Sequence, residues 1–151
     1  MVFKEKYSKF FEKIGRSKFM VLSTSKDDFV TSRMVSIIVI DGKFYFQTDK
    51  NFKKYNQIIV NPNVSLCIDN IQINGICCDV RRPIENKTFC EIFKEKYPSS
   101  YKNYSLLESE RLLEIEPIYI YIECWHHIEG VSYIEVFDVK NKKYTMKKYV
   151  R

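Results

Sequence analysis

The sequence predicts a mainly β (α+β) protein built on an antiparallel barrel with peripheral helices. Two observations support this fold class: predicted strands outnumber predicted helices, and they follow one another at short spacing through tight turns. The chain has 151 residues, of which 45% are apolar, enough for one core without disulfide staples. No repeat, low-complexity segment or linker divides it, so we expect one domain over residues 1–151.

The N-terminal segment predicts a helix followed by a strand. Residues 2–14 carry aromatic and aliphatic side chains at helical spacing, and Gly15 suits the end of that helix. Residues 19–25 predict a short strand, and residues 26–28 predict its turn.

The next segment predicts a β-hairpin with strands at residues 29–40 and 43–48. Both strands are rich in apolar, β-branched and aromatic residues. Between them, Asp41-Gly42 is the dipeptide that best accepts the positive φ angles of a tight primed turn.

A helix over residues 51–60 is expected directly after this hairpin, and Asn61-Pro62 ends it. Its apolar stripe consists of Phe52, Tyr55, Ile58 and Ile59. A helix N-terminus presents free backbone N–H groups, and Lys53 and Lys54 lie in that first turn. Together these features favour an anion site, most naturally for the phosphate of a cofactor.

The second half of the chain again predicts more strands than helices. Residues 64–68 and 71–80 form a second antiparallel pair, and residues 114–125 form the longest strand. A final hairpin is expected from residues 131–139 and 143–150.

Two helices are expected between these strands. Residues 86–97 place apolar side chains along one side of a helix, and Pro98 ends it. Residues 105–112 predict a shorter helix, because Ser105 and Glu108 have the spacing of a capping box.

Composition argues against a membrane or secreted protein. No apolar run approaches the ~20 residues that cross a bilayer, and the N-terminus lacks the apolar block and cleavage site of a signal peptide. The five cysteines, an odd count without repeated spacing, do not form a disulfide framework. We therefore expect a cytoplasmic protein.

The net charge of +6 comes entirely from the first sixty residues, which hold 12 Lys and Arg against 6 Asp and Glu. A basic half can indicate nucleic-acid binding, which normally uses arginine-rich clusters with interleaved aromatics. Arginine is scarce here, with only Arg16 and Arg33 in this half, so no nucleic-acid partner is expected.

Several chemistries are not expected. The four glycines lie too far apart for a dinucleotide fingerprint or a P-loop. His126 and His127 are adjacent, as are Cys77 and Cys78, so on a strand each pair points to opposite faces and cannot hold one metal. No nucleophile elbow accompanies the histidines, which argues against acyl transfer.

Three further polar residues are candidates for the phosphate site. Arg33 interrupts an apolar strand, and a buried arginine needs an anion partner. Gln47 and Thr48 end the next strand and can donate to a phosphate or to the polar edge of a ring. Solvated strand ends and an exposed lysine face of the helix would account for the same residues without a ligand.

The chain resembles the pyridoxamine-phosphate-oxidase-like, FMN-binding split-barrel superfamily in an ordered set of short motifs. These are Arg33-Met34-Val35-Ser36, the hairpin, Phe46-Gln47-Thr48, Lys53-Lys54 and Asn61-Pro62-Asn63-Val64-Ser65-Leu66. The resemblance covers residues 15–80, with a fainter match at Trp125.

The resemblance implies a six-stranded split β-barrel with Greek-key topology, and a homodimer whose interface builds two FMN sites. Arg33 and Lys54 would hold the phosphate, with Lys53 close by. The Val35-Ser36 backbone, preceded by Met34 in the same motif, would lie along the isoalloxazine ring.

The remaining site residues are also implied by the resemblance. Gln47 and Thr48 would bond flavin oxygens. Asn70 would contact the cofactor from the partner subunit, and Trp125 matches an aromatic side chain that the family places close to the ring.

The resemblance also sets the expected function. Residues 147–151 lack the Arg- and His-bearing segment of true pyridoxamine-phosphate oxidases, which argues against vitamin synthesis. The shorter general-stress-protein and nitroimidazole-resistance groups fit better and imply an FMN-dependent oxidoreductase that reduces a small oxidised substrate, such as a nitro compound. No catalytic acid or base stands out. The alternative is a protein that binds flavin or haem without turnover, with His126 or His127 as a haem ligand.

Overall fold

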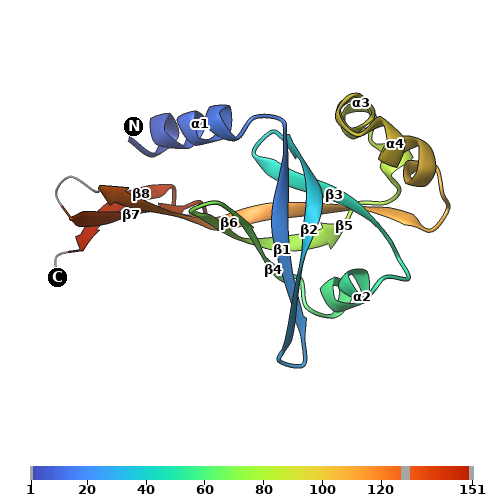
Figure 1. Ribbon diagram of the computed structural model, residues 1–151, viewed down its shortest axis with the longest axis horizontal. Coiled ribbons are helices and arrows are strands. Elements are labelled where there is room, and N and C mark those ends of the chain that lie inside the picture. Colours follow the sequence, from blue (N-terminus) through green and yellow to red (C-terminus); the bar gives the residue numbers. More distant parts are fainter. Residues whose placement is uncertain (1, 127–129, 150–151) are drawn as a thin grey trace.

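The computed structural model describes residues 2–126 and 130–149, and of residues 125 and 126 only the backbone. Its strands form one antiparallel sheet in the order β3-β2-β1-β4-β5-β6-β7-β8, and β3 also pairs with β6. The strands are β1 (Ser17–Lys26), β2 (Phe29–Ile40), β3 (Lys43–Asp49), β4 (Asn63–Ile68), β5 (Ile71–Asp79), β6 (Glu110–His126), β7 (Val131–Asp138) and β8 (Lys143–Tyr149). The β3–β6 pairing closes the first six strands into the barrel that the sequence led us to expect (Figure 1).

The barrel has Greek-key topology, which confirms the prediction. The spatial order β3-β2-β1-β4 places three hairpin-connected strands beside a fourth that returns next to the first. At 17 residues, β6 is long enough to pair with β3 and β5 and then to continue into the β7–β8 hairpin outside the barrel (Figure 1).

Helices and short turns surround the barrel. They are α1 (Val2–Ile14), α2 (Lys53–Val60), α3 (Lys87–Lys96) and α4 (Pro98–Ser100), with a 3-10 turn η1 (Pro83–Glu85) and a π-helical turn η2 (Tyr101–Ser105). None of the helices in the described ranges has the length and apolarity to cross a bilayer. Pro98 follows the end of α3, as expected. It is also the first residue of α4, because proline is tolerated at the first position of a helix.

Period-two alternation on the strands divides the core into two clusters. Phe44 and Phe46 point into the barrel, together with Phe10 and Ile14 of α1. Tyr45 points the other way, into a second cluster under α3 that also contains Phe89, Ile92 and Phe93. Cys77 is buried and Cys78 is exposed, as the same alternation predicts, and all five cysteines are free thiols.

The β2–β3 turn also follows the sequence prediction. Asp41 has φ +49° and Gly42 has φ +74°, the two positive angles that a primed turn requires.

The predicted helix over residues 105–112 is wrong. Glu110 begins β6, and this strand pairs with β3 from Asp49↔Glu110 to Phe44↔Ile115. Ser105 does not cap a helix; its hydroxyl donates to Gln47 Oε1 at 2.7 Å. Pairing with β3 on one side and β5 on the other outweighs the local helix signal, since strand formation depends on tertiary partners.

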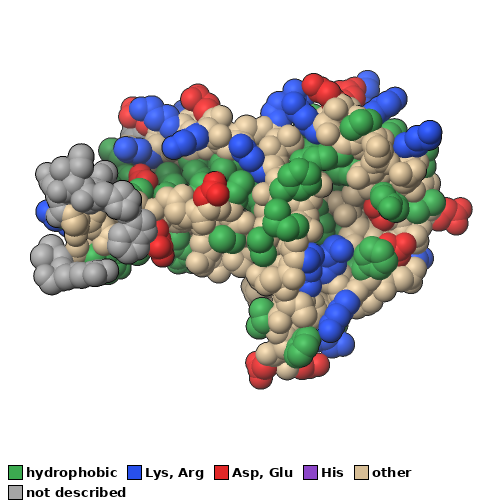
Figure 2. Space-filling view, viewed as in Figure 1, with side chains coloured by type: hydrophobic (Ala, Val, Ile, Leu, Met, Phe, Trp, Pro, Cys, Tyr) green, Lys and Arg blue, Asp and Glu red, His purple; other side chains and the backbone are tan. Residues whose placement is uncertain are grey.

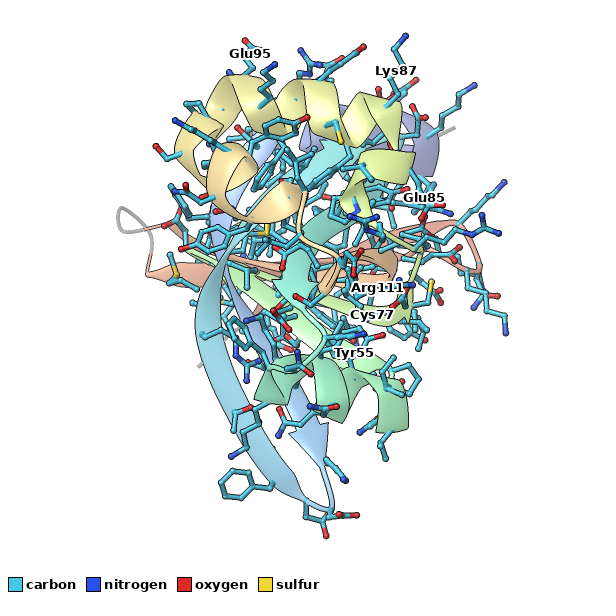
Figure 3. The ribbon with its side chains drawn as sticks, turned by 90° about the vertical axis from the view of Figure 1, so that its right-hand side faces the viewer. Tyr55, Cys77, Glu85, Lys87, Glu95 and Arg111 are labelled. Carbon is cyan, nitrogen blue, oxygen red and sulfur yellow. The ribbon has the colours of Figure 1, made fainter. Side chains whose placement is uncertain are left out.

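A charged cluster fixes α2 against the barrel. Arg111 of β6 donates two 2.8 Å hydrogen bonds to the Asp79 carboxylate, and Tyr55 of α2 donates to the same carboxylate at 2.6 Å. These hydrogen bonds outweigh burial and lower the pKa of Asp79. Figure 3 shows Tyr55 and Arg111 on neighbouring elements at this junction. The first turn of α2 is therefore held in place relative to β5 and β6.

Candidate cofactor site

A cavity of about 380 Å³ lies where β2 and β3 meet α2, α3 and the start of β6. Its lining includes six of the residues that the sequence singled out: Met34, Val35, Ser36, Gln47, Thr48 and Lys54. The structure thus brings together residues that are up to 20 positions apart in the sequence. The first three lie in the middle of β2, Gln47 and Thr48 lie near the end of β3, and Lys54 lies at the start of α2.

Arg33 is not a lining residue, but it directly precedes Met34 in β2 and its charge acts on Lys54. A hydrogen-bond network fixes its side chain. Its guanidinium donates to Thr24 Oγ1 at 2.8 Å, to Thr31 Oγ1, and to the carbonyl oxygen of Leu22 at 3.2 Å. Both threonine hydroxyls in turn donate to Gln57 Oε1, at 2.6 and 2.7 Å. Because their protons point to Gln57, the threonine oxygens face Arg33 as acceptors.

This network is neutral, so it orients Arg33 without balancing its charge. Burial lowers the pKa of Arg33, and burial together with repulsion from Arg33 lowers the pKa of Lys54. Within the described part of the chain, neither cation has a carboxylate at ion-pair distance. Glu110 attracts Lys54 from beyond ion-pair distance, and a bound anion in direct contact would stabilise both cations.

Two further groups at the same place suit a phosphate. Thr48 Oγ1 is buried and has no hydrogen-bond partner among the described residues. The helix α2 begins after Phe52, which has no side chain that could cap it, and the first N–H groups of a helix have no partner inside the helix. The donor set of Arg33, Lys54, Thr48 and the α2 N-terminus fits the phosphate group of FMN.

Among the described residues that line the cavity, Glu110 has the most strongly altered pKa, and it was not among the residues predicted from the sequence. It is only 5% exposed, and it accepts a 2.9 Å hydrogen bond from Gln47 Nε2. Burial raises the pKa of Glu110 to about 7; nearby Asp49 adds to this effect, whereas Lys54 and Gln47 oppose it. Glu110 was missed because its segment was read as a helix, where no pairing with Gln47 could be foreseen.

Gln47 has a different environment from the one expected. Its amide lies between Glu110 and Ser105, with Oε1 accepting from the Ser105 hydroxyl and Nε2 donating to the carboxylate. Both ends of the amide thus already have protein partners, so Gln47 orders the cavity wall.

Lys53 lies outside this cavity. Its ammonium group is 4.6 Å from the centre of the exposed Phe29 ring, and the residue lines a separate, shallow depression near the β1–β2 turn. Adjacent residues of a helix point about 100° apart, which separates Lys53 from Lys54.

Asn70 also lies away from the cavity, at the β4–β5 turn, where its amide donates to the carbonyl oxygen of Glu123. At about 3.3 Å per residue, the 13 steps along β6 from Glu110 to Glu123 correspond to roughly 40 Å. Asn70 and the cavity of the same chain are therefore far apart. The side chain of Trp125 lies outside the described residues, although its backbone pairs with Ser132 in the same distal region.

The histidines contribute no described side chain. The backbone of His126 pairs with Val131, and His127 lies outside the described residues. No group of three metal-ligating side chains occurs within the ranges that the structure describes.

Comparisons with known proteins identify the family and agree with the fold. The sequence model of the pyridoxamine 5'-phosphate oxidase family matches residues 3–124. No curated protein matches the sequence. General Stress Protein 26 from Bacillus anthracis str. Sterne is 25% identical, with 80% of this chain and 93% of that chain covered and a TM-score of 0.58.

Two more distant solved structures share the fold. A pyridoxamine 5'-phosphate oxidase-related, FMN binding protein from Nostoc punctiforme is 11% identical, with 88% and 87% of the two chains covered and a TM-score of 0.60. A NimC/NimA family protein from Clostridium acetobutylicum is 16% identical, with 99% and 94% covered and a TM-score of 0.54. The chain belongs to the pyridoxamine 5'-phosphate oxidase family of split barrels, whose members typically bind FMN or F420.

Proposed function

We propose that this protein binds FMN in the cavity between β2, β3 and α2 and uses it to reduce a small oxidised substrate. One observation carries the proposal: Arg33 and Lys54, two partly buried cations without a close counter-ion, lie near the unpartnered Thr48 hydroxyl and the α2 N-terminus. A phosphate would satisfy all of these groups together.

Each part of FMN has a place in this proposal. Arg33, Lys54, Thr48 and the first N–H groups of α2 hold the phosphate. Met34 is exposed, Val35 is buried, and Ser36 is intermediate, so this stretch of β2 offers a backbone edge and an apolar patch to the ring. FMN supplies the electron transfer, and the protein supplies its position and electrostatic environment.

We further propose that the working form is a homodimer. Asn70 and Trp125 lie on the distal part of the chain, too far from the cavity of their own subunit to reach a cofactor there. A second copy could bring both residues to the first copy's flavin, which is the arrangement implied by the family.

The absorbance spectrum of the purified protein tests cofactor identity. We expect flavin bands, or their appearance when FMN is added to colourless protein, and one FMN for each chain. After reduction with dithionite, the flavoprotein should be reoxidised by a nitroaromatic compound faster than free FMN under the same conditions. A preparation that takes up no flavin would contradict the whole proposal, whereas uptake without faster reoxidation would contradict only the nitro substrate.

A parallel titration with haem tests the alternative function. A Soret band on adding haem, lost in the His126→Ala/His127→Ala double variant, would favour a haem-binding protein. The side chains of both histidines lie outside the described residues, so this titration is the test of the alternative.

A further inference from the structure

The wall of the cofactor cavity contains a buried acid, Glu110, at the start of β6. Its side chain belongs to a residue that is only 5% exposed. An ionised carboxylate at this depth is costly unless a cation pairs with it. Lys54 lines the same cavity, but no ion pair within 4.0 Å joins the two residues in the described chain. The geometry therefore places a carboxyl group without a close counter-ion beside the cations proposed for the phosphate.

Hydrogen bonds hold one oxygen of this carboxyl group and leave the other open. Glu110 Oε2 accepts from Gln47 Nε2 at 2.9 Å, and Gln47 is held in turn by the Ser105 hydroxyl at 2.7 Å. Glu110 Oε1 has no hydrogen-bond partner among the described residues. This atom can therefore carry a proton without disturbing the contact to Gln47.

The charged groups around Glu110 come from few elements. In the described lining of the cavity, β3 contributes Asp49, α2 contributes Lys54 and η2 contributes the phenol of Tyr104, whereas β2, α3 and α4 contribute uncharged side chains. On β6 itself, Arg111 is paired with Asp79. Figure 2 shows acidic, basic and apolar side chains together on the face between α2 and α4.

These surroundings place the titration of Glu110 close to neutral pH. Burial is the largest effect, Asp49 adds to it and Lys54 opposes it, which together raise the pKa of Glu110 to about 7. A phosphate bound at Lys54 would compete for the positive charge that attracts Glu110, and would add negative charge to the cavity. Both effects disfavour the ionised carboxylate. Binding of the phosphate and binding of a proton at Glu110 then favour each other, because linkage is reciprocal.

We propose that Glu110 is a further residue of the cofactor site, and that FMN binds the form of the protein in which Glu110 is protonated. Ionisation of Glu110 weakens the binding of FMN but not that of riboflavin, which has no phosphate. This inference rests on the proposed FMN site and adds the group that regulates its affinity. The affinity for FMN contributed by Glu110 is complete below the pKa of about 7 and falls as pH rises through it.

Fluorescence titration with FMN and riboflavin across neutral pH tests the proposal on wild type and Glu110→Gln. The variant keeps an acceptor for Gln47 and has the charge of the protonated acid. For FMN, the dissociation constant of wild type divided by that of the variant should rise with pH, by roughly tenfold for each unit by which FMN raises the pKa of Glu110. Ionisation of the phosphate itself affects both proteins and cancels in this ratio. For riboflavin the ratio should stay constant, and Glu95→Gln on α3 (Figure 3) should behave as wild type with both flavins.

Two further measurements do not depend on Glu110→Gln alone. Asp49→Asn removes a charge that raises the pKa of Glu110, so its affinity for FMN should begin to fall at a lower pH than that of wild type. Calorimetry in two buffers of different ionisation enthalpy counts the protons taken up with FMN. Near neutral pH, wild type should take up more protons per FMN than Glu110→Gln, whereas riboflavin should give no difference.

The outcomes separate this inference from the FMN site itself. If wild type and Glu110→Gln both bind FMN with the same pH profile, Glu110 does not regulate the site and the inference is overturned while FMN binding stands. A pH-dependent ratio for riboflavin would also overturn it, because Glu110 would then respond to the ring. Uptake of neither flavin would overturn the proposed function, and this inference with it.

Discussion

Gln47 Nε2 of β3 donates a 2.9 Å hydrogen bond to the carboxylate of Glu110 at the start of β6. The two residues lie one diagonal step apart on the paired strands, since Asp49 is directly opposite Glu110 and Gln47 is opposite Leu112. This contact links barrel closure to the wall of the cofactor cavity, because β3–β6 pairing closes the barrel and both side chains line the cavity.

The raised pKa of Glu110 predicts a pH-dependent stability. Its value is about 7 in the folded chain against 4.5 ordinarily. Between these values the folded state binds more protons than the unfolded state, so the free energy of unfolding falls as pH rises through this window. The upper limit of the loss is about 3 kcal/mol, at 1.36 kcal/mol per unit. Below this pH window Glu110 is protonated in both states and causes no loss of unfolding free energy. Above the window the loss no longer changes with pH.

Glu110→Gln should remove this dependence while keeping an acceptor for Gln47. Urea unfolding of the FMN-free variant and the FMN-free wild type should be measured between pH 4 and pH 8. As pH rises, the free energy of unfolding of the variant should increasingly exceed that of the wild type, and the difference should then level off. Glu95→Gln, on the exposed face of α3 in Figure 3, is the matched control and should leave the wild-type profile unchanged. A constant difference between Glu110→Gln and wild type would show that Glu110 keeps an ordinary pKa.

Gln57 is expected to matter for stability and for FMN in separable ways. Gln57→Leu removes the acceptor of the Thr24 and Thr31 hydroxyls and should lower the free energy of unfolding by about 1–3 kcal/mol. Gln57→Glu keeps both acceptors but places a negative charge beyond the threonines that hold Arg33, so FMN should bind at least several-fold more weakly. Riboflavin, which lacks the phosphate, is the control ligand and should bind Gln57→Glu as it binds wild type. A parallel loss for both flavins would mean that Gln57 shapes the ring pocket instead.

Gly75 should tolerate no side chain. A Cβ atom there would lie 2.6 Å from Ile115 Cγ2 and 2.8 Å from the backbone oxygen of Glu116, at the irregularity of the β5–β6 pairing. Because a backbone atom cannot move aside easily, Gly75→Ala should lower the free energy of unfolding by about 1–3 kcal/mol. Cys78→Ala, at an exposed position of the same strand, should change it by less than about 0.5 kcal/mol. Similar urea midpoints for the two variants would disprove the steric argument.

Much of the fold could be predicted because the decisive signals are local. The Asp41-Gly42 turn and the alternation of Phe44, Tyr45 and Phe46 act within a few residues. The helix expected at residues 105–112 failed for the opposite reason, since β6 there depends on β3 and β5, which are distant in the sequence. Pairing between strands that are distant in the sequence leaves no recognisable pattern in the local sequence of either strand.

The candidate site shows the same division. Lys54 and Thr48 could be chosen from their positions at a helix start and a strand end, and both line the cavity. The neutral network around Arg33 and the burial of Glu110 arise only from three-dimensional packing, so neither could be read from residue spacing. Lys53 and Lys54 were indistinguishable as a dipeptide, and only the helix geometry separates them.

That separation gives a paired test of the phosphate site. Lys54 lines the cavity and Lys53 lies over Phe29, so Lys54→Ala should weaken FMN while Lys53→Ala should not. A charge-assisted contact contributes ~1.5–3 kcal/mol, and ~1.4 kcal/mol corresponds to tenfold, so the loss for Lys54→Ala should be roughly one to two powers of ten.

Fluorescence titration with FMN and with riboflavin measures both effects in the same preparations. Riboflavin should bind wild type, Lys53→Ala and Lys54→Ala about equally, because none of the three loses a contact to the ring. The thermal midpoint without flavin should change little, since Lys54 has no ion-pair partner within the described chain. If both lysine variants weakened FMN equally, the phosphate would lie between them over the helix N-terminus, contrary to the cavity geometry. If Lys54→Ala weakened both flavins alike, Lys54 would contact the ring and the phosphate would have to bind elsewhere.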